Sequence, residues 1–415
     1  FRTLQEAGAD SAARAFLPIN NGFVKEKALK IYNVKIYTMD KSRRVIDCGW
    51  VDIRDGIIIA VECGTPRDIC DGDIDGRGAS LYPGFIDSHT HLGLTTNGVG
   101  VESEDFNEES EPCAAQLRII DAVNPFDTSF EKARNAGVTS VLISPGSMNP
   151  IAGDIIAVST MGKRIDKMLL RRVGIKFALG ENPKMTYMNR DESPCTRMAI
   201  ASIIREALFK AKKYMEDKEN AQDTDDLPEF DLKCEALIPL LKREIKAHFH
   251  CHRADDIFTA LRISREFGLD CVLVHCTDGH LITDELAEEK ASAIIGPIIC
   301  DPCKPELANI TPENAGILAA KGIKVSICTD HSETPIEYLP ITVGIAIKNG
   351  MSFENALESV TVCAAENGGI ADICGSVEES KRADIVLFDG NPFEVMSEPQ
   401  LLVIGGTAVG GKMLG

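Results

Sequence analysis

Two short motifs, far apart in the chain, contain the residue types that bind a divalent metal ion. One is His-Thr-His at residues 89–91 and the other is Thr-Asp-His at residues 329–331. Each follows an apolar segment with the pattern of a buried strand. In an extended segment residues i and i+2 point to the same face, so His89 and His91 can bind one cation together. Asp330 can complete such a site and accept a proton from the water that attacks a substrate.

The other histidines extend this pattern. For an isolated pair, two histidines that only alternate along a strand would be a sufficient explanation. However, all eight histidines of the chain lie at or just beyond the end of an apolar segment: His89, His91, His248, His250, His252, His275, His280 and His331. Neutral imidazole is a common metal ligand, and mixed sites of imidazole and carboxylate suit zinc or a similar divalent ion. We therefore expect one or two divalent metal ions, zinc first, with iron or manganese as alternatives.

Length and composition indicate a globular protein that acts on a small molecule. The chain has 415 residues and a net charge of −19, which argues against nucleic acid or an anionic membrane as a partner. No apolar stretch approaches the ~18 residues of a membrane span. Fourteen cysteines spread through apolar segments are typical of a reducing cytoplasm. Residues 1–27 are expected to be a leader, either disordered or a remnant of cloning, and a homo-oligomer is compatible with the sequence.

The centre of the chain, residues 83–375, alternates short apolar segments with amphipathic helices. A helical spacing of apolar residues recurs at 199–215, 257–267, 314–320 and 353–364. Eight strand–helix repeats of this kind predict a (β/α)8 barrel, a TIM-like fold whose active site lies at the carboxyl ends of the strands. The eight candidate parallel strands are 85–87, 139–143, 154–159, 175–179, 245–250, 271–275, 293–295 and 325–328.

Both flanks of this centre have the texture of short strands and turns. Residues 28–82 contain Asp55-Gly56 between two apolar runs, a strong hairpin signal. Residues 376–412 repeat the texture, with a turn at 389–392. Each flank is too short to bury a core alone, so we expect one small β-sandwich domain built from both ends of the chain.

The order of these motifs resembles the amidohydrolase superfamily over roughly residues 28–412, and in detail the imidazolonepropionase-related branch. The segments that carry the resemblance are Pro83–His91, Ala178–Lys184, His250–Asp256 and Ala383–Phe388. The resemblance implies that five residues surround the metal: His89, His91, His250, His275 and Asp330. It also implies a carboxylated lysine or a glutamate at the end of the fourth strand, where the chain offers Lys176, Glu181 and Lys184. We favour Glu181 because it is already ionised, and we leave a mononuclear site open.

The same resemblance assigns roles to other polar residues near the strand ends. His252 and His248 are expected to support the metal ligands or to bind substrate, and His280 is a plausible substrate contact. Either His275 or His252 would stabilise the developing oxyanion. Arg253 could bind a substrate carboxylate through two parallel hydrogen bonds, or it could form a structural ion pair with Asp255 or Asp256.

The expected reaction is hydrolysis of a carbon–nitrogen bond in a small amide, cyclic amide or peptide-like molecule. Asp330 would act as general base and then as general acid. The nearest alternative is an aminohydrolase, a deaminase of a nitrogen heterocycle. Superfamily deaminases usually carry a glutamate three residues after the strand-five ligand, where this chain has Arg253, which cannot shuttle protons. An alternative of another class is a non-catalytic barrel that serves as a scaffold, but such proteins typically lose metal ligands.

Overall fold

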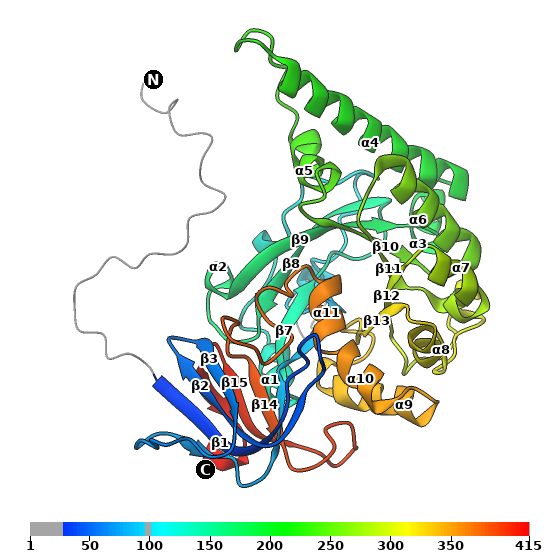
Figure 1. The fold of residues 1–415 in the computed structure, drawn as a ribbon. Helices are drawn as coiled ribbons and strands as arrows, with labels where there is room; N and C mark the ends of the chain where they lie inside the picture. Colours follow the sequence, from blue (N-terminus) through cyan, green and yellow to red (C-terminus); the bar gives the residue numbers. More distant parts are fainter. Residues whose placement is uncertain (1–27, 96–100, 415) are drawn as a thin grey trace.

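The computed structural model describes residues 28–95 and 101–414, which form a barrel with a terminal sheet beside it (Figure 1). The leader expected at residues 1–27 lies outside the described residues. The barrel sheet has the strand order β13-β12-β11-β10-β9-β8-β7-β6. Its strands are β6 (Phe85–Thr90), β7 (Val138–Ile143), β8 (Ile151–Ser159), β9 (Leu169–Ala178), β10 (Lys246–Cys251), β11 (Cys271–His275), β12 (Ser292–Ile295) and β13 (Lys324–Ile327). Together they confirm a TIM-like barrel.

One strand corrects the prediction of eight parallel strands. β8 pairs antiparallel with β7 on one side and with β9 on the other. The linker at residues 144–150 is shorter than the dozen or so residues that a parallel crossover needs, so the chain turns back in a hairpin. All nine residues of β8 are buried, and an unbroken apolar pattern carries no information about strand direction. The hairpin loop therefore lies at the carboxyl ends of the parallel strands.

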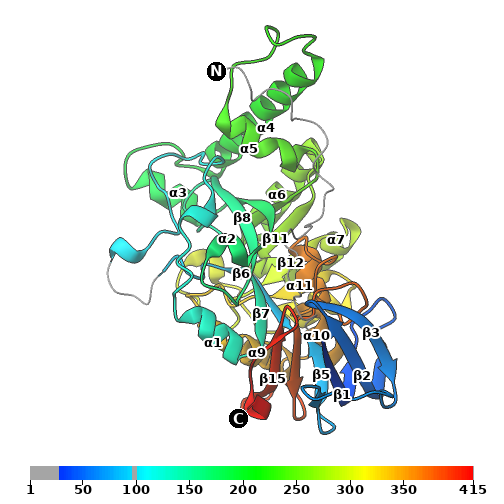
Figure 2. The same cartoon turned by 90° about the vertical axis from the view of Figure 1, so that its left-hand side faces the viewer.

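The helices of the barrel cover its outer face and one end. They are α1 (Ser129–Asn135), α2 (Ile165–Met168), α3 (Glu181–Met188), α4 (Arg197–Asn220), α5 (Leu232–Leu241), α6 (Ala254–Phe267), α7 (Thr283–Glu288), α8 (Asn314–Ala320), α9 (Leu339–Lys348), α10 (Phe353–Ser359) and α11 (Val362–Asn367). The predicted helix at 353–364 is thus two helices. The long α4 and the shorter α5 lie at the end of the molecule opposite the terminal sheet (Figure 2). No helix in the described part of the chain combines the length and hydropathy of a membrane span.

The terminal sheet contains strands from both ends of the chain. Its order is β16-β15-β14-β5-β1-β2-β3, and β4 pairs with β1. The bounds are β1 (Ala28–Tyr37), β2 (Val45–Arg54), β3 (Ile57–Cys63), β4 (Ile74–Asp75), β5 (Ser80–Pro83), β14 (Ile385–Phe388), β15 (Pro399–Ile404) and β16 (Thr407–Gly410). The strands form one continuous sheet, so a sandwich of two sheets is not confirmed. The domain boundaries themselves stay a prediction.

Alternation along β14 explains how this sheet is held against the barrel. Ile385 and Leu387 belong to a core enclosed by the sheet itself. Val386 and Phe388 point the other way and belong to the barrel core, where Phe388 stacks on Phe85 with ring centroids 5.8 Å apart. Successive strand residues face opposite sides, so one strand serves two cores.

The first and last strands of the barrel meet at a seam that side chains complete. The Asp330 N–H donates to the His89 carbonyl at 3.2 Å, and the His91 N–H donates to the His331 carbonyl at 2.7 Å. Asp87 is fully buried there, and its carboxylate accepts the Thr329 hydroxyl at 2.5 Å and the Thr329 N–H at 3.2 Å. The seam therefore joins the two motifs that the sequence places far apart.

Candidate metal centre

The carboxyl ends of four barrel strands bring the predicted metal ligands together. His89 and His91 lie at the end of β6, and the Nε2 atom of each is 3.4 Å from Asp330 Oδ1, just after β13. His275, the last residue of β11, has its ring centroid 5.6 Å from that of His89 and 4.6 Å from that of His250. Among the described residues, two groups have ligand atoms close enough for one ion: His89, His275 and Asp330, and His250, His252 and His275.

Hydrogen bonds to Nδ1 leave the Nε2 atoms of three rings for a ligand. His91 Nδ1–H donates to the Ser144 carbonyl at 2.8 Å, and His275 Nδ1–H donates to the Gly296 carbonyl at 2.6 Å. Because a carbonyl only accepts, each of these rings carries its proton on Nδ1 and a lone pair on Nε2. Such outer contacts fix the tautomer of metal-binding histidines. His252 Nδ1 is likewise held, 2.8 Å from the Thr277 hydroxyl.

Several atoms at the centre are buried without a hydrogen-bond partner. Both ring nitrogens of His250 and Oδ1 of Asp330 have none among the described residues. An unsatisfied buried polar group costs about 1–3 kcal/mol, so this arrangement favours an occupant that accepts several lone pairs at once. A divalent cation does so, and a set of imidazoles with one carboxylate suits zinc and its neighbours. The donor set thus fits the predicted metal.

Burial and neighbouring charges hold these residues in the protonation states that a metal requires. Burial lowers the pKa of His89 and of His250 well below the ordinary value and lowers the pKa of His275 to about 4. Burial would raise the pKa of Asp330, but His275, His91 and Lys176 hold it at about 2. Metal ligands must be deprotonated, and the centre presents neutral imidazoles beside an ionised carboxylate.

Two of the candidate ligands have an unusual backbone conformation. His275 has φ of 72° and Asp330 has φ of 54°, both in the left-handed region that non-glycine residues rarely adopt. Conformations of this kind cost of order 1–3 kcal/mol and concentrate at functional sites. Here they turn a side chain toward the centre directly after a strand ends.

The fourth strand of the barrel, β9, contributes a lysine. Lys176 is fully buried and its Nζ lies 3.1 Å from His89 Nε2. Burial lowers its pKa to about 8. Glu181, which we favoured, is the first residue of α3, and neither ligand group found in the described chain includes it. Lys184 lies in the same helix. The contact of Lys176 with His89 thus gives the lysine support that the Glu181 carboxylate lacks.

The remaining predicted residues lie at different distances from the centre. His252 stacks on His275 with ring centroids 4.7 Å apart. His248 is fully buried on β10, two residues before His250, and both of its ring nitrogens are unpartnered among the described residues. His280 is outside both ligand groups, with Nδ1 3.2 Å from the Thr277 carbonyl. Arg253 is half-exposed and forms two hydrogen bonds with Asp255, at 3.0 and 2.9 Å.

Sequence reasoning missed two charged residues that follow β12. Glu306 is buried, with Oε1 3.7 Å from His252 Nε2 and 3.9 Å from His250 Nε2. Its Oε2 accepts the Glu181 N–H at 2.9 Å. Lys304 Nζ is 2.7 Å from Glu306 Oε1. Burial would raise the pKa of Glu306, but His252, Lys304 and the Glu181 N–H together hold it below its ordinary value. The sequence holds no motif for these contacts, because they depend on the path of the 296–306 loop.

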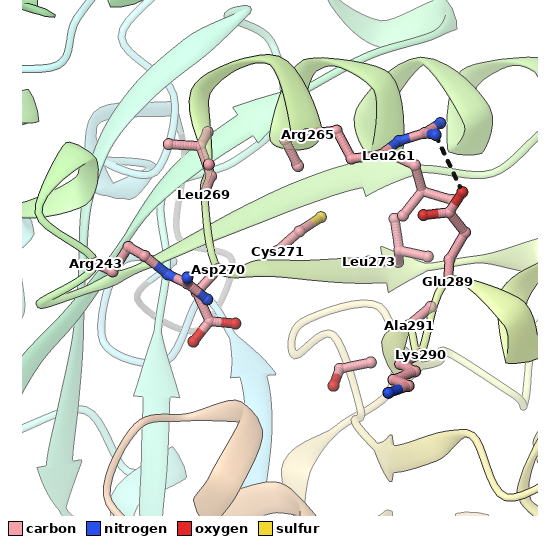
Figure 3. A pocket seen from close by; sticks show the side chains of 13 residues that line it. Arg243, Leu261, Arg265, Leu269, Asp270, Cys271, Leu273, Glu289, Lys290 and Ala291 are labelled. Carbon is pink, nitrogen blue, oxygen red and sulfur yellow. Dashed lines mark ion pairs between the residues drawn. The ribbon is translucent and has the colours of Figure 1, made fainter.

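A surface groove of about 310 Å³ lies at the other end of the strands (Figure 3). Arg243 and Asp270, which precede β10 and β11, line it with Cys271, and Arg265 forms an ion pair with Glu289 at 3.4 Å. Since the catalytic ends of barrel strands are their carboxyl ends, this groove is not part of the metal centre.

A barrel with histidines and an aspartate gathered at its strand ends defines a class of hydrolases, and comparison with known proteins identifies the family. The model of the amidohydrolase family matches residues 80–409. The chain belongs to this family and is a hydrolase of the kind that acts on carbon–nitrogen bonds.

Individual relatives agree with this assignment. An amidohydrolase from Thermotoga maritima MSB8 has a similar structure, with 35% identity, a TM-score of 0.87, and coverage of 92% of this chain and 100% of that one. Imidazolonepropionase of Caldanaerobacter subterraneus is 25% identical over 89% of this chain and 93% of its own length. Amidohydrolase tasK of Hapsidospora irregularis is 26% identical over 87% of this chain, which spans only 40% of that protein.

Proposed function

We propose that the protein is a metal-dependent hydrolase that cleaves the carbon–nitrogen bond of a small amide, cyclic amide or peptide-like molecule. The observation that carries the proposal is the convergence of His89, His91, His250 and His275 on Asp330, with unpartnered lone pairs at its centre. A scaffold protein would have no reason to bury these groups without partners, since each one costs free energy.

Each residue of the centre has a proposed part in the reaction. The four histidines and Asp330 would hold the metal, and when bound it would lower the pKa of water from about 15.7 toward ~7 and polarise the scissile carbonyl. Asp330, ionised at neutral pH, accepts the proton of the attacking water and passes it to the leaving nitrogen. His252, whose Nδ1 is fixed by Thr277, presents Nε2 to the developing oxyanion.

We propose Lys176, ahead of Glu181, as the contribution of β9 to the metal centre. An amine with a pKa of about 8 is partly neutral at physiological pH and can add to CO2 with loss of one proton. The product is a carboxylate at the end of the lysine side chain, which is the type of group that bridges two ions. A lysine that stays unmodified would leave a site for one ion.

Deamination of a nitrogen heterocycle is the second candidate because of Glu306. The sequence argument against it was the lack of a carboxylate near His250, and Glu306 supplies one from another loop. A deaminase needs this acid to deliver a proton to a ring nitrogen. Ion pairing with Lys304 keeps Glu306 ionised, which makes it a poor proton donor and favours amide hydrolysis.

Two measurements test the proposal. Elemental analysis of protein loaded with zinc, manganese or iron should show one or two ions per chain. A hydrolysis screen with N-acyl amino acids, dipeptides and cyclic amides should then show turnover that depends on the metal. Protein that neither contains nor takes up a metal would refute the centre, and rapid ammonia release from guanine, adenosine or cytosine would replace hydrolysis of an amide by deamination.

A further inference from the structure

A chain of polar side chains lies beside the metal centre, at the carboxyl ends of the strands. It consists of Ser147, Asn182, Lys304 and Glu306. Asn182 Nδ2 donates to the Ser147 hydroxyl at 2.7 Å, and Lys304 Nζ donates to Asn182 Oδ1 at 2.8 Å and lies 2.7 Å from Glu306 Oε1. These residues come from the loop between β7 and β8, the start of α3, and the loop after β12. Three loops that are distant in sequence thus converge on Lys304.

Lys304 is the member of this chain with capacity to bind something more. An ammonium group has three N–H donors and accepts nothing. Two of its donors have acceptors, Asn182 Oδ1 and Glu306 Oε1, and the described residues provide no third. The Lys304 side chain is 23% exposed, whereas that of Glu306 is 1% exposed. Asn182 and Glu306 therefore fix the ammonium in place while its remaining donor can reach a ligand.

The position of Lys304 makes the substrate the natural ligand for that donor. Its neighbour Glu306 lies within 4 Å of His250 and of His252, so the ammonium is close to where the substrate reacts. Its charge lowers the pKa of His250, His252 and His275. Only an acceptor can use the third N–H, and an anionic oxygen makes the stronger, charge-assisted bond.

Arg253, the cation expected to bind a substrate carboxylate, is committed elsewhere. Its guanidinium forms two hydrogen bonds with Asp255, and its side chain is 48% exposed. Acidic residues of the 102–111 segment would repel an anion, but two of them, Glu109 and Glu111, are paired with Arg190 and Lys233. The exposed remainder is screened by salt, whereas a direct contact with Lys304 is not.

We propose that Lys304 determines substrate specificity by binding a carboxylate of the substrate, so that N-acyl amino acids and dipeptides are accepted in preference to neutral amides. This inference rests on the proposed hydrolysis and names its substrate class. Hydrogen bonds to charged groups contribute enough to change binding about 10- to 100-fold. Lys304 thus acts by placing the scissile bond, and the metal centre performs the reaction.

The test compares a panel of N-acetyl amino acids with the corresponding carboxamides, which lack only the charge. For the wild type, KM for the carboxylates should be lower than for the carboxamides. In Lys304→Gln, which keeps donors for Asn182 and Glu306, KM for the carboxylates should rise about 10- to 100-fold, with kcat and the carboxamide values nearly unchanged. Lys304→Arg should restore much of the discrimination, and Lys163→Gln, in an exposed loop after β8, is the matched control.

Two results would overturn the inference. One is equal KM values for both series in the wild type. The other is loss of discrimination in Arg253→Gln with none in Lys304→Gln. If the wild type hydrolyses neither series, the proposed function fails, and calorimetric binding of the same compounds decides about Lys304. Tighter binding of carboxylates that disappears in Lys304→Gln supports the inference, and equal binding of the two series refutes it.

Discussion

The seam between the first and last barrel strands makes a strong prediction for Asp87. This carboxylate is fully buried and accepts hydrogen bonds from the Thr329 hydroxyl at 2.5 Å, the Thr329 N–H at 3.2 Å and the His89 N–H at 3.3 Å. Burial raises its pKa to about 7, because the surroundings disfavour its charge more than these donors stabilise it. We expect Asp87→Ala to destabilise the barrel and to loosen the metal centre.

The size of the effect follows from the donors that lose their acceptor. A buried donor without a partner costs about 1–3 kcal/mol, so three donors, partly rescued by local movement, give a loss of about 3–5 kcal/mol. Asp87→Asn keeps one acceptor oxygen but places an NH2 group against another donor, so we expect about 2–4 kcal/mol. Thr329→Val removes the hydroxyl alone and should cost about 1–2 kcal/mol.

The assay combines urea denaturation with metal titration for the single variants and for Asp87→Ala with Thr329→Val. The double variant should show a coupling energy of about 0.5–3 kcal/mol, because the two side chains share a hydrogen bond. Metal affinity should fall about 10- to 100-fold, as for other residues that orient metal ligands. Ser88→Ala, which removes another seam contact to Ser326, is the control for loss of stability without loss of Asp87. Unchanged stability and unchanged metal affinity in Asp87→Asn would refute the reasoning.

Three further predictions concern other parts of the molecule. Asp330→Asn should keep the fold and most of the metal but lower turnover at least ~100-fold, and a near wild-type rate would show that another group takes the proton. Gly180→Ala should reduce stability and disturb Glu306, because φ is 86° and the added Cβ would lie 2.7 Å from Glu306 Oε2; denaturation and a crystal structure would reveal a tolerated methyl. The hydrogen bond of Asp231 with Lys210 lowers the pKa of this carboxyl to about 2, so its contribution, about 2 kcal/mol, is present above about pH 4 and lost as the pH falls toward 2. Asp231→Asn should remove that loss in acid unfolding curves.

The parts of the centre that lie in strands were predictable from the sequence, and the parts that lie in loops were not. His89, His91 and Asp330 follow buried strands, and parallel strands of a barrel bring their carboxyl ends together whatever the loops do. Glu306 and Lys304 reach the centre through a loop whose path no local pattern encodes. Periodicity did locate β8, but burial on both faces erased the alternation that could have revealed its packing, and only the short linker before it indicated its direction.

The seam also sets a time at which the metal centre can exist. Asp87 and Thr329 are 242 residues apart, so at roughly 5–20 residues per second the ribosome needs roughly 10–50 seconds between them. During this interval the nascent chain carries the histidines of β6 without the aspartate that faces them. Metal capture by the full set of ligands is therefore coupled to closure of the barrel, and an interrupted or truncated chain that lacks β13 has half a centre and no general base.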